Sequence, residues 1–357
     1  MGGAARCDVV IVGGRVAGAL TAARMAARGL RVIVLESQAF PSDTMSTHFF
    51  RGDGLVRSLR EVGVLDEVLA TGAPPLRAEI FYVNGRSGRE EPPQEPGEVG
   101  YCLSVRRITL DAILAAHVSI IPGVVFRTRT RVADVIWEGP RVSGVVTDDG
   151  AAYLADVVVG ADGRRSRMAQ RVHAATQEHH APARVMYFQY VSGWTSPAGD
   201  PPSVPEFSLL GDELAYVFPS DQGIACVAIS LPVAAWTTRR ERREAQFAER
   251  LRRHAGLRDR LECSQPVGAL VSAPPTPSVV RCAAGPGWAL VGDAGTHQDP
   301  WSGLGMDTAA RQAEALAGSF DDASWHLTYQ QARDAVTLEG FTETLRLGRD
   351  LRALDSS

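Results

Sequence analysis

Glycine and acidic residues stand together at three places where the chain could bind a nucleotide. These are the turn of residues 13–18 (GGRVAG), the pair Asp162 and Gly163, and the pair Gly292 and Asp293, each after a short valine-rich run. A single Gly-Asp pair is more often an ordinary turn. Three such junctions favour the carboxyl edge of a parallel sheet, where backbone N–H groups and carboxylates bind nucleotides.

The first junction lies in a unit typical of dinucleotide binding. Residues 8–12 predict a buried strand, 17–28 a helix, and 31–35 a second buried strand that ends at Glu36. In such a unit the helix N-terminus faces a pyrophosphate, and the terminal acid accepts hydrogen bonds from a ribose. We therefore expect a dinucleotide to contact Gly13, Gly14, Arg15, Val16, Ala17, Gly18, Glu36 and Ser37.

Arg15 departs from this pattern, because the fingerprint Gly-x-Gly-x-x-Gly has a glycine at its position. The middle glycine lets the backbone approach the phosphates closely. The side chain of Arg15 can lie outward or reach a phosphate oxygen, and the sequence leaves both interpretations open.

Composition narrows the class of protein. At 357 residues the chain is long for one core, so two domains are expected. A net charge of −4 gives no reason to expect nucleic acid, and no apolar run approaches the roughly 20 residues of a membrane span. All 37 basic residues are arginine, which excludes a catalytic lysine. Five scattered cysteines and an N-terminus that enters a core strand at once predict a cytoplasmic protein.

Taken together, the junctions identify a resemblance to a known family. The chain resembles the single-component FAD-dependent monooxygenases of the p-hydroxybenzoate hydroxylase fold, which also includes geranylgeranyl reductases and flavin halogenases. The resemblance extends to about Ala317 and implies non-covalent FAD whose ADP portion lies at Gly13, Gly18 and Glu36. It further implies cofactor contacts from Arg107 (in RITLD), Asp162, Gly163, Gly292 and Asp293.

The family continues with a proline and a G-x-G-x-N loop whose backbone N–H groups face the flavin ring. The resemblance thus implies ring contacts from Pro300, Gly303, Leu304, Gly305 and Met306. Asp307 replaces the usual asparagine, and Thr296 stands where a histidine is common, with His297 one residue later. The sequence has no second dinucleotide fingerprint, so NAD(P)H is expected to bind only transiently as reductant.

We therefore predict an α/β fold: a Rossmann-like FAD-binding domain with an inserted, mainly antiparallel β substrate domain and a helical C-terminus. The insertion follows because Rossmann-like strands recur on both sides of a segment of aromatic-rich strands. Residues 239–260 are expected to form one arginine-rich helix. The predicted ranges are 1–76, 101–180 and 276–320 for FAD binding, 77–100 and 181–275 for the substrate domain, and 321–357 for the C-terminal helices.

Catalytic and substrate-binding residues have no motif of their own. His48 and Arg51 lie close together in a polar segment and could face flavin and substrate, or could satisfy polar groups on the surface. Tyr187, Tyr216 and Phe218 could line an apolar substrate pocket, with core packing as the alternative for each. No metal site is expected, because the pair of histidines at residues 179–180 has no third ligand nearby.

The resemblance implies an NAD(P)H- and O2-dependent monooxygenase that hydroxylates an apolar, aromatic or polycyclic small molecule through a flavin C4a-hydroperoxide. Residues 216–219 (YVFP) partly match the Y-x-W-x-F-P segment of geranylgeranyl reductases, so reduction of an isoprenoid-type double bond is the alternative. A non-catalytic, flavin-binding redox sensor is a third hypothesis. Halogenation is not expected, because the halogenase lysine and W-x-W-x-I-P segment are absent. The chain is expected to be a monomer or homodimer.

Overall fold

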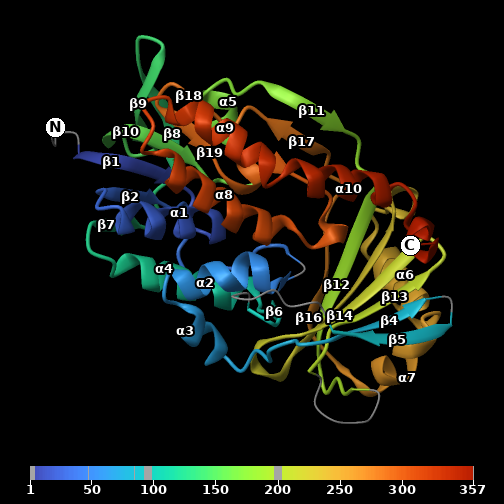
Figure 1. Cartoon of the computed structure of the whole chain (residues 1–357). Coiled ribbons are helices and arrows are strands. Elements are labelled where there is room, and N and C mark those ends of the chain that lie inside the picture. The colour runs from blue at the N-terminus through green and yellow to red at the C-terminus, as the bar shows by residue number, and fades with distance from the viewer. Residues whose placement is uncertain (1–4, 47, 84, 92–98, 197–202, 357) are drawn as a thin grey trace.

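The computed structural model describes residues 5–46, 48–83, 85–91, 99–196 and 203–356. The predicted domain ranges 1–76, 77–100, 181–275 and 321–357 each include some residues outside this description, and the domain boundaries stay a prediction. Within the described residues the strands form one sheet of eight, one of seven and two smaller sheets. The two large sheets lie at opposite ends of the molecule, and the C-terminal helices run along one side of both (Figure 1).

The eight-stranded sheet contains the predicted nucleotide-binding unit and confirms the α/β fold class. Its main path is β18-β19-β10-β1-β2-β7, in which β19, β10, β1, β2 and β7 run parallel. Val12 pairs with Gly160, and Gly160 pairs with Leu290, so the three predicted junctions begin at one edge of the sheet. The strands are β1 (Ala5–Val12), β2 (Val32–Leu35), β7 (Val124–Arg127), β8 (Val132–Glu138), β9 (Arg141–Thr147), β10 (Ala152–Gly160), β18 (Ala284–Gly285) and β19 (Trp288–Leu290).

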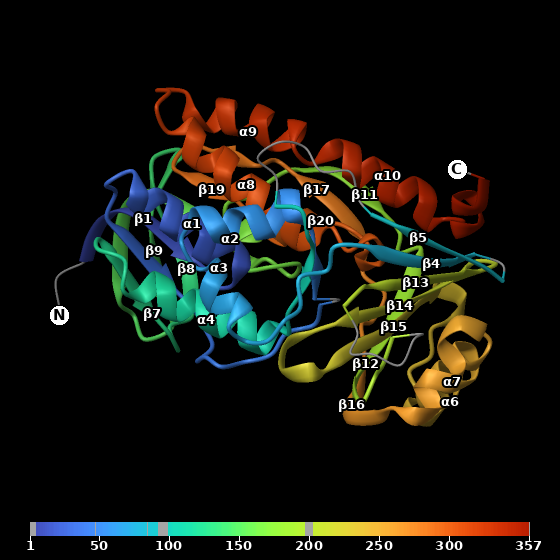
Figure 2. The same ribbon diagram turned by 60° about the horizontal axis from the view of Figure 1, so that its bottom comes forward.

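Both faces of this sheet are covered, which explains the valine-rich runs of its strands. Val9 and Ile11 pack on one face with α1 (Val16–Ala27), α4 (Arg107–Ser119) and α8 (Gly305–Ser319). Val10 and Val12 pack on the other face with β8, β9 and α5 (Arg167–Arg171). Figure 2 shows α1 and α8 side by side over the sheet, with the short helices α2 (Arg57–Glu61) and α3 (Leu65–Leu69) beyond them.

The seven-stranded sheet, in the order β16-β12-β15-β14-β13-β4-β5, is antiparallel except where β13 and β4 pair in parallel. Helices α6 (Arg240–Arg252) and α7 (Ala255–Cys263) cover one of its faces. The prediction of a single helix over 239–260 is therefore wrong. The break comes at His254, which leaves helical geometry because its buried imidazole Nδ1 hydrogen-bonds the Ser208 hydroxyl at 2.8 Å. The strands are β4 (Glu79–Val83), β5 (Arg86–Glu90), β12 (Arg184–Ser192), β13 (Glu206–Leu210), β14 (Glu213–Pro219), β15 (Ala225–Pro232) and β16 (Gln265–Ser272).

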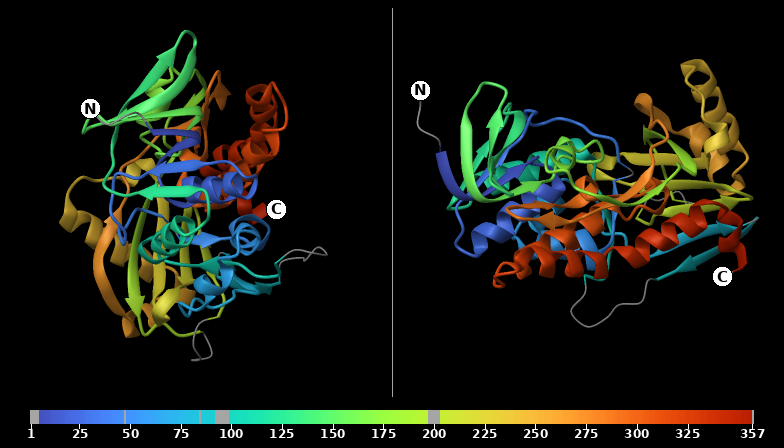
Figure 3. Two further views of the ribbon diagram at one scale, coloured as in Figure 1. Left: turned by 90° about the vertical axis from the view of Figure 1, so that its left-hand side faces the viewer. Right: turned by 90° about the horizontal axis from the view of Figure 1, so that it is seen from above.

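The C-terminal helices are tied to the nucleotide edge through a small sheet. Buried Arg333 of α9 donates to the Thr296 hydroxyl at 2.9 Å and to the Arg281 carbonyl at 2.8 Å. In Figure 3 the C-terminal helices extend from one large sheet to the other. Across the described residues no helix combines the length and the apolar composition needed to cross a bilayer. The remaining elements are β3 (Phe49–Phe50), β6 (Leu103–Ser104), β11 (Thr176–His180), β17 (Ser278–Arg281), β20 (Thr296–His297), α9 (Trp325–Ala335) and α10 (Leu338–Gly348).

A buried ion pair joins the two large sheets. The Arg106 guanidinium, at the start of α4, donates to both Asp221 carboxylate oxygens at 2.8–3.2 Å, and the turn after β14 carries Asp221. The Thr109 hydroxyl donates to the same carboxylate at 2.8 Å. Burial raises the pKa of Asp221, but the Arg106 and Thr109 hydrogen bonds outweigh it and lower the pKa below its usual value. The carboxylate therefore holds the two sheets together as an anion.

Candidate functional site

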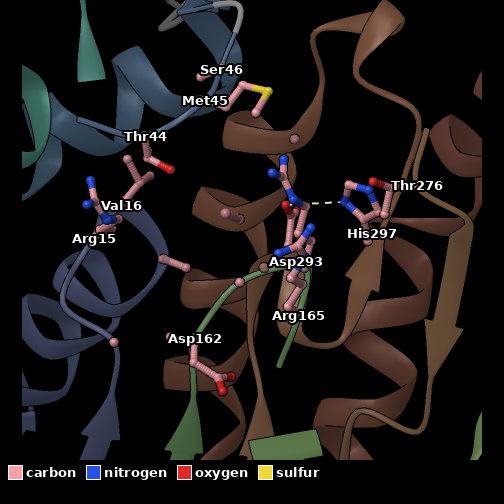
Figure 4. A pocket seen from close by; sticks show the side chains of 18 of the residues that line it. Arg15, Val16, Thr44, Met45, Ser46, Asp162, Arg165, Thr276, Asp293 and His297 are labelled. Atoms are coloured by element: carbon pink, nitrogen blue, oxygen red, sulfur yellow. Dashed lines mark ion pairs between the residues drawn. The ribbon is translucent and has the colours of Figure 1, made fainter. Parts of the chain in front are cut away.

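A cavity of about 530 Å³ lies at the carboxyl edge of the eight-stranded sheet, between that sheet and the seven-stranded one. Figure 4 shows Arg15 and Val16 on one side of it, His297 and Thr276 on the other, and Met45 and Ser46 at a third side. The cavity brings together these predicted cofactor residues: Gly13, Arg15, Val16, Ala17, Glu36, Ser37, Arg107, Asp162, Gly163, Gly292, Asp293, Pro300, Gly303, Gly305 and Met306. Gly14, Gly18 and Leu304 do not line the cavity themselves, but each is a sequence neighbour of a residue that does.

The turn between β1 and α1 is shaped to expose backbone N–H groups. Gly13 has a φ of +102°, and a Cβ at Gly13, Gly14 or Gly18 would collide with neighbouring atoms, so glycine is required at all three positions. The Gly14 N–H donates to the buried Glu36 carboxylate at 2.8 Å. Helix α1 has no side-chain cap and no acid in its first turn. Its N-terminal N–H groups are therefore available to a pyrophosphate, and Glu36 is held where a ribose would lie.

The Arg15 side chain is held by other protein groups, although it lines the cavity. Its guanidinium donates to the completely buried Asp111 carboxylate at 2.5 Å and to the Ser42 carbonyl at 3.1 Å. Arg107 holds the same carboxylate through three contacts of 3.0–3.1 Å. Two arginines thus share one carboxylate at the cavity wall and leave one net positive charge beside the helix N-terminus. The sequence carried a signal for the Arg107–Asp111 contact, because these two residues have the i, i+4 spacing of a helical ion pair, but none for the contact of Arg15 with Asp111.

Asp293 pairs with His297, which stands one residue after the position where the resembled family commonly has a histidine. The His297 Nδ1 lies 3.3 Å from an Asp293 carboxylate oxygen. Burial raises the pKa of Asp293, but His297 outweighs it, so the pKa is lowered overall. Buried Gln298 also lines the cavity, and its side-chain nitrogen has no hydrogen-bond partner among the described residues. An anionic acceptor and an orphaned donor at this wall fit a polar cofactor such as FAD.

The loop before α8 presents backbone to the cavity. Gly303 has a φ of +70°, and α8 begins at Gly305 without a side-chain cap. Gly303, Gly305 and Met306 line the cavity, whereas Asp307 does not. The uncapped helix N-terminus offers partial positive charge to the electron-rich edge of a flavin ring. These features fit the loop that the sequence predicts for that edge.

His48 is buried behind the cavity wall. Its Nε2 lies 2.6 Å from the Tyr190 hydroxyl, and its backbone has a φ of +66°. Burial, followed by the charge of Arg107, lowers the pKa of His48 to about 3, so the imidazole is neutral. His48 does not line the cavity, although Ser46, which binds the His48 backbone N–H through its hydroxyl, does. A catalytic role for His48 stays a prediction.

The Arg51 side chain contacts residues that do not line the cavity. Its guanidinium lies over the Phe49 ring and 3.8 Å from the Asp307 carboxylate, and the side chain is 38% exposed. It does not line the cavity, so its predicted contact with flavin and substrate stays untested by this geometry.

The three predicted aromatic residues lie on two faces of the seven-stranded sheet. Tyr216 and Phe218 face the eight-stranded sheet and pack with Phe49 and Trp301. The Tyr216 hydroxyl donates to the Trp301 carbonyl at 2.6 Å, which joins β14 to the loop before α8. Tyr187 lies on the opposite face, under α6.

Several lining residues have no signal in the sequence. Arg164 and Arg165 follow the Asp162-Gly163 junction, but a strand end alone does not say that the side chains turn inward. The apolar end of the cavity comes from distant segments that only the fold assembles. Its residues are Met45, Val185, Met186, Ala273, Pro274, Pro275 and Met306.

Comparisons with known proteins agree on the cofactor. A family model described as "FAD binding domain" matches residues 6–336. The menaquinone reductase of Mycolicibacterium smegmatis is 28% identical over 98% of this chain and 84% of its own length. The digeranylgeranylglycerophospholipid reductase 2 of Methanothermobacter thermautotrophicus is 28% identical over 87% of this chain and 76% of its own length.

A monooxygenase matches a smaller part. The 6-hydroxy-3-succinoylpyridine 3-monooxygenase HspB of Pseudomonas putida is 32% identical over 46% of this chain and 43% of its own length. Among solved structures, the myxobacterial chondrochloren halogenase CndH superposes with a TM-score of 0.82, covering 96% of this chain and 82% of its own. At 21% identity that likeness shows a shared fold alone.

Proposed function

The chain belongs to the FAD binding domain family, and we propose that this FAD-dependent oxidoreductase reduces a carbon–carbon double bond in an isoprenoid-type substrate. The observation that carries the proposal is the extent of similarity to the two reductases. Each matches more than four fifths of the chain. The match to the monooxygenase covers less than half of the chain. Menaquinone and digeranylgeranyl lipids, the substrates in the names of those reductases, both carry isoprenoid chains.

The two ends of the cavity differ in polarity, as such a reaction requires. The nucleotide end presents Glu36, Arg15 and Arg107. The other end presents thioether, valine and proline side chains, among them Met45 and Met186. An isoprenoid chain has no hydrogen-bonding groups, so it binds by burying apolar surface, at about 25 cal/mol per Å². The apolar end is the surface of the cavity suited to it.

The residues that would hold FAD follow from the geometry. The glycine turn and the α1 N-terminus would bind the diphosphate, Glu36 the adenosine ribose, Asp293 the ribityl chain, and the loop before α8 the polar edge of the ring. Bound FAD, reduced by transiently bound NAD(P)H, would supply the hydride for the substrate. The Tyr216–Trp301 hydrogen bond would keep the seven-stranded sheet packed against the loop before α8, so that water is excluded from the cavity.

Product analysis tests the proposal directly. Reduced, FAD-loaded protein is incubated without oxygen with menaquinone or with a geranylgeranyl lipid, and the products are weighed by mass spectrometry. We expect a product whose isoprenoid chain has gained two hydrogen atoms, located by fragmentation because reduction of a quinone ring to a quinol gives the same mass change. A parallel aerobic assay should show no oxygen uptake. Substrate unchanged by reduced enzyme in every case would contradict the reductase assignment.

The variant Met45→Glu tests the assignment of the apolar end. A carboxylate there is expected to abolish substrate reduction and leave FAD content unchanged, because Met45 packs against the apolar cluster that contains Met186 and Phe188. Leu327→Glu is the matched control, because it places the same charge on an exposed apolar residue of α9 outside the cavity lining, and it should leave substrate reduction intact. Equal activity in the two variants would remove Met45 from the proposed substrate site.

Hydroxylation of an apolar small molecule is the second candidate, favoured by the 32% identity to the monooxygenase. It requires oxygen and NAD(P)H, and its product carries one oxygen atom from O2. Repeating the aerobic assay with ¹⁸O2 separates the two activities. Label in the product, with oxygen uptake that tracks the substrate, would establish the monooxygenase.

A further inference from the structure

The first turn of α8 carries a buried carboxylate on the side away from the cavity. Asp307 stands where the resembled family has asparagine, and its side chain is 4% exposed. Its Oδ1 accepts the backbone N–H of Leu55 at 2.8 Å and that of Arg51 at 3.1 Å. Gly54 makes room for it, because a Cβ at Gly54 would collide with the carboxylate. Asp307 thus fastens the segment after β3 to the helix that faces the flavin.

An asparagine Oδ1 could accept the same two hydrogen bonds without carrying a charge. The aspartate buries a negative charge at this position, so it needs a counter-charge. The Arg51 guanidinium lies 3.8 Å from Asp307 Oδ2. Burial raises the pKa of Asp307 to about 6, and Arg51 is the first of the groups that oppose the rise. The other charged neighbours are Asp53, which Arg311 pairs, and Glu79, which also faces Arg51.

Asp307 lies in the same first turn of α8 as Gly305 and Met306, which line the flavin edge of the cavity. The α8 N-terminus stabilises negative charge there through its uncapped N–H groups. A bare carboxylate in the same turn would oppose that effect at short range in a low-dielectric interior. An ion pair opposes it much less, because the two charges cancel at a distance.

We propose that Arg51 is a positioning residue that neutralises Asp307, so that the α8 N-terminus can stabilise negative charge on reduced flavin. The proposal rests on bound FAD and is independent of the substrate, so it stands or falls separately from the reductase assignment. It assigns Arg51 a role through Asp307 and the helix, which explains why a residue outside the cavity belongs to the flavin site.

The test is the midpoint potential of bound FAD, measured without substrate against a reference dye during anaerobic reduction. The variants are Arg51→Met, Asp307→Asn and the double variant. Well above the pKa of Asp307, Arg51→Met is expected to shift the ratio of reduced to oxidised flavin about tenfold toward oxidised, which is about 30 mV for a two-electron couple. Asp307→Asn leaves the Arg51 charge uncompensated and should shift the ratio toward reduced flavin. The double variant lacks both charges and should return close to the wild-type potential. Well below that pKa the Arg51→Met shift should shrink, because Asp307 takes up a proton.

Arg57→Met is the matched control, since Arg57 lies in the same segment and pairs with Glu61 and Glu314 but not with Asp307. A wild-type potential in Asp307→Asn would overturn the proposal, and so would a double variant shifted as far as Arg51→Met. An equal shift in Arg57→Met would do the same. If Arg51→Met loses FAD, Arg51→Lys keeps the charge and should retain the wild-type potential, while Asp307→Asn alone still decides the question.

Discussion

Replacing Arg15 by methionine tests whether this residue stabilises the fold or binds a phosphate of the cofactor. In the structure, Arg15 shares the buried Asp111 carboxylate with Arg107. The variant removes the hydrogen bond to buried Asp111, worth about 1.5–3 kcal/mol. It also removes three hydrogen bonds to the more exposed Ser42 and Asp43, and it leaves the carboxylate paired by Arg107. We therefore expect the free energy of unfolding to fall by about 2 kcal/mol. Arg24→Met is the control, because Arg24 is similarly buried but pairs with partly exposed Glu61, and the expected loss there is below about 1 kcal/mol.

The double variant Arg15→Met/Arg107→Met sharpens this prediction. Once the first arginine is gone, removing the second leaves a completely buried carboxylate without a cation, which costs about 3–5 kcal/mol. The double variant should therefore lose about 5–7 kcal/mol, more than the sum of two single losses of about 2 kcal/mol. Additive losses would show that the two arginines do not share one carboxylate.

The assay is urea unfolding of the FAD-free protein, because bound FAD would add its own linkage to the measured stability. FAD affinity is then measured separately by fluorescence titration. Since Asp111 and the Ser42 carbonyl occupy the Arg15 guanidinium, the dissociation constant should rise less than about tenfold in Arg15→Met. Unchanged stability together with a larger loss of FAD affinity would refute this reasoning and make Arg15 a phosphate ligand.

Three further predictions concern titratable side chains. Asp293→Ala should strip FAD from the purified protein, and a normal flavin absorbance after gel filtration would contradict its cofactor role. Buried His48 should make stability fall as pH drops from 6.5 toward 3, by up to about 1.4 kcal/mol per pH unit, because the unfolded chain takes up a proton that the folded imidazole refuses. Urea midpoints across that range should lose this slope in His48→Gln, and an unchanged slope would assign it to other groups. Because its pKa is lowered in the folded protein, Asp221 stabilises the fold at pH values above about 3.8, its ordinary pKa, and this stabilisation is lost as the pH falls further. Asp221→Asn should lack this acid-dependent loss of stability, which tryptophan fluorescence would follow.

Local pattern was sufficient to predict a bound dinucleotide and the edge of the sheet where it would bind, whereas the resemblance to a known family implied that the dinucleotide is FAD. Valine-rich runs that end in glycine mark strands buried on both faces, and parallel strands must bring their carboxyl ends to one edge. The register of Val12, Gly160 and Leu290 confirms that the three junctions are neighbours. Glu36 was predictable for the same reason, because it follows the second strand directly.

Strand register decided which aromatic side chains face the flavin domain. Phe188, Ala228 and Tyr216 form one row across three strands, and Tyr187 and Ile229 belong to the next row. Successive residues of a strand point to opposite faces, so Tyr187 turns toward α6 while Tyr216 turns toward the flavin loop. Both are tyrosines in apolar runs, and nothing in their immediate sequence tells them apart.

The amino-acid sequence by itself thus determined the α/β class, the dinucleotide-binding unit and the residues at the ends of its strands, because these depend on contacts between near neighbours and on the handedness of the chain. Only the tertiary structure decided the partners of the charged side chains. Arg15 meets Asp111, and Arg51 meets Asp307 across 256 positions of the chain. An arginine reaches any carboxylate that the fold brings within a few ångströms, so its role depends on packing that local spacing does not encode.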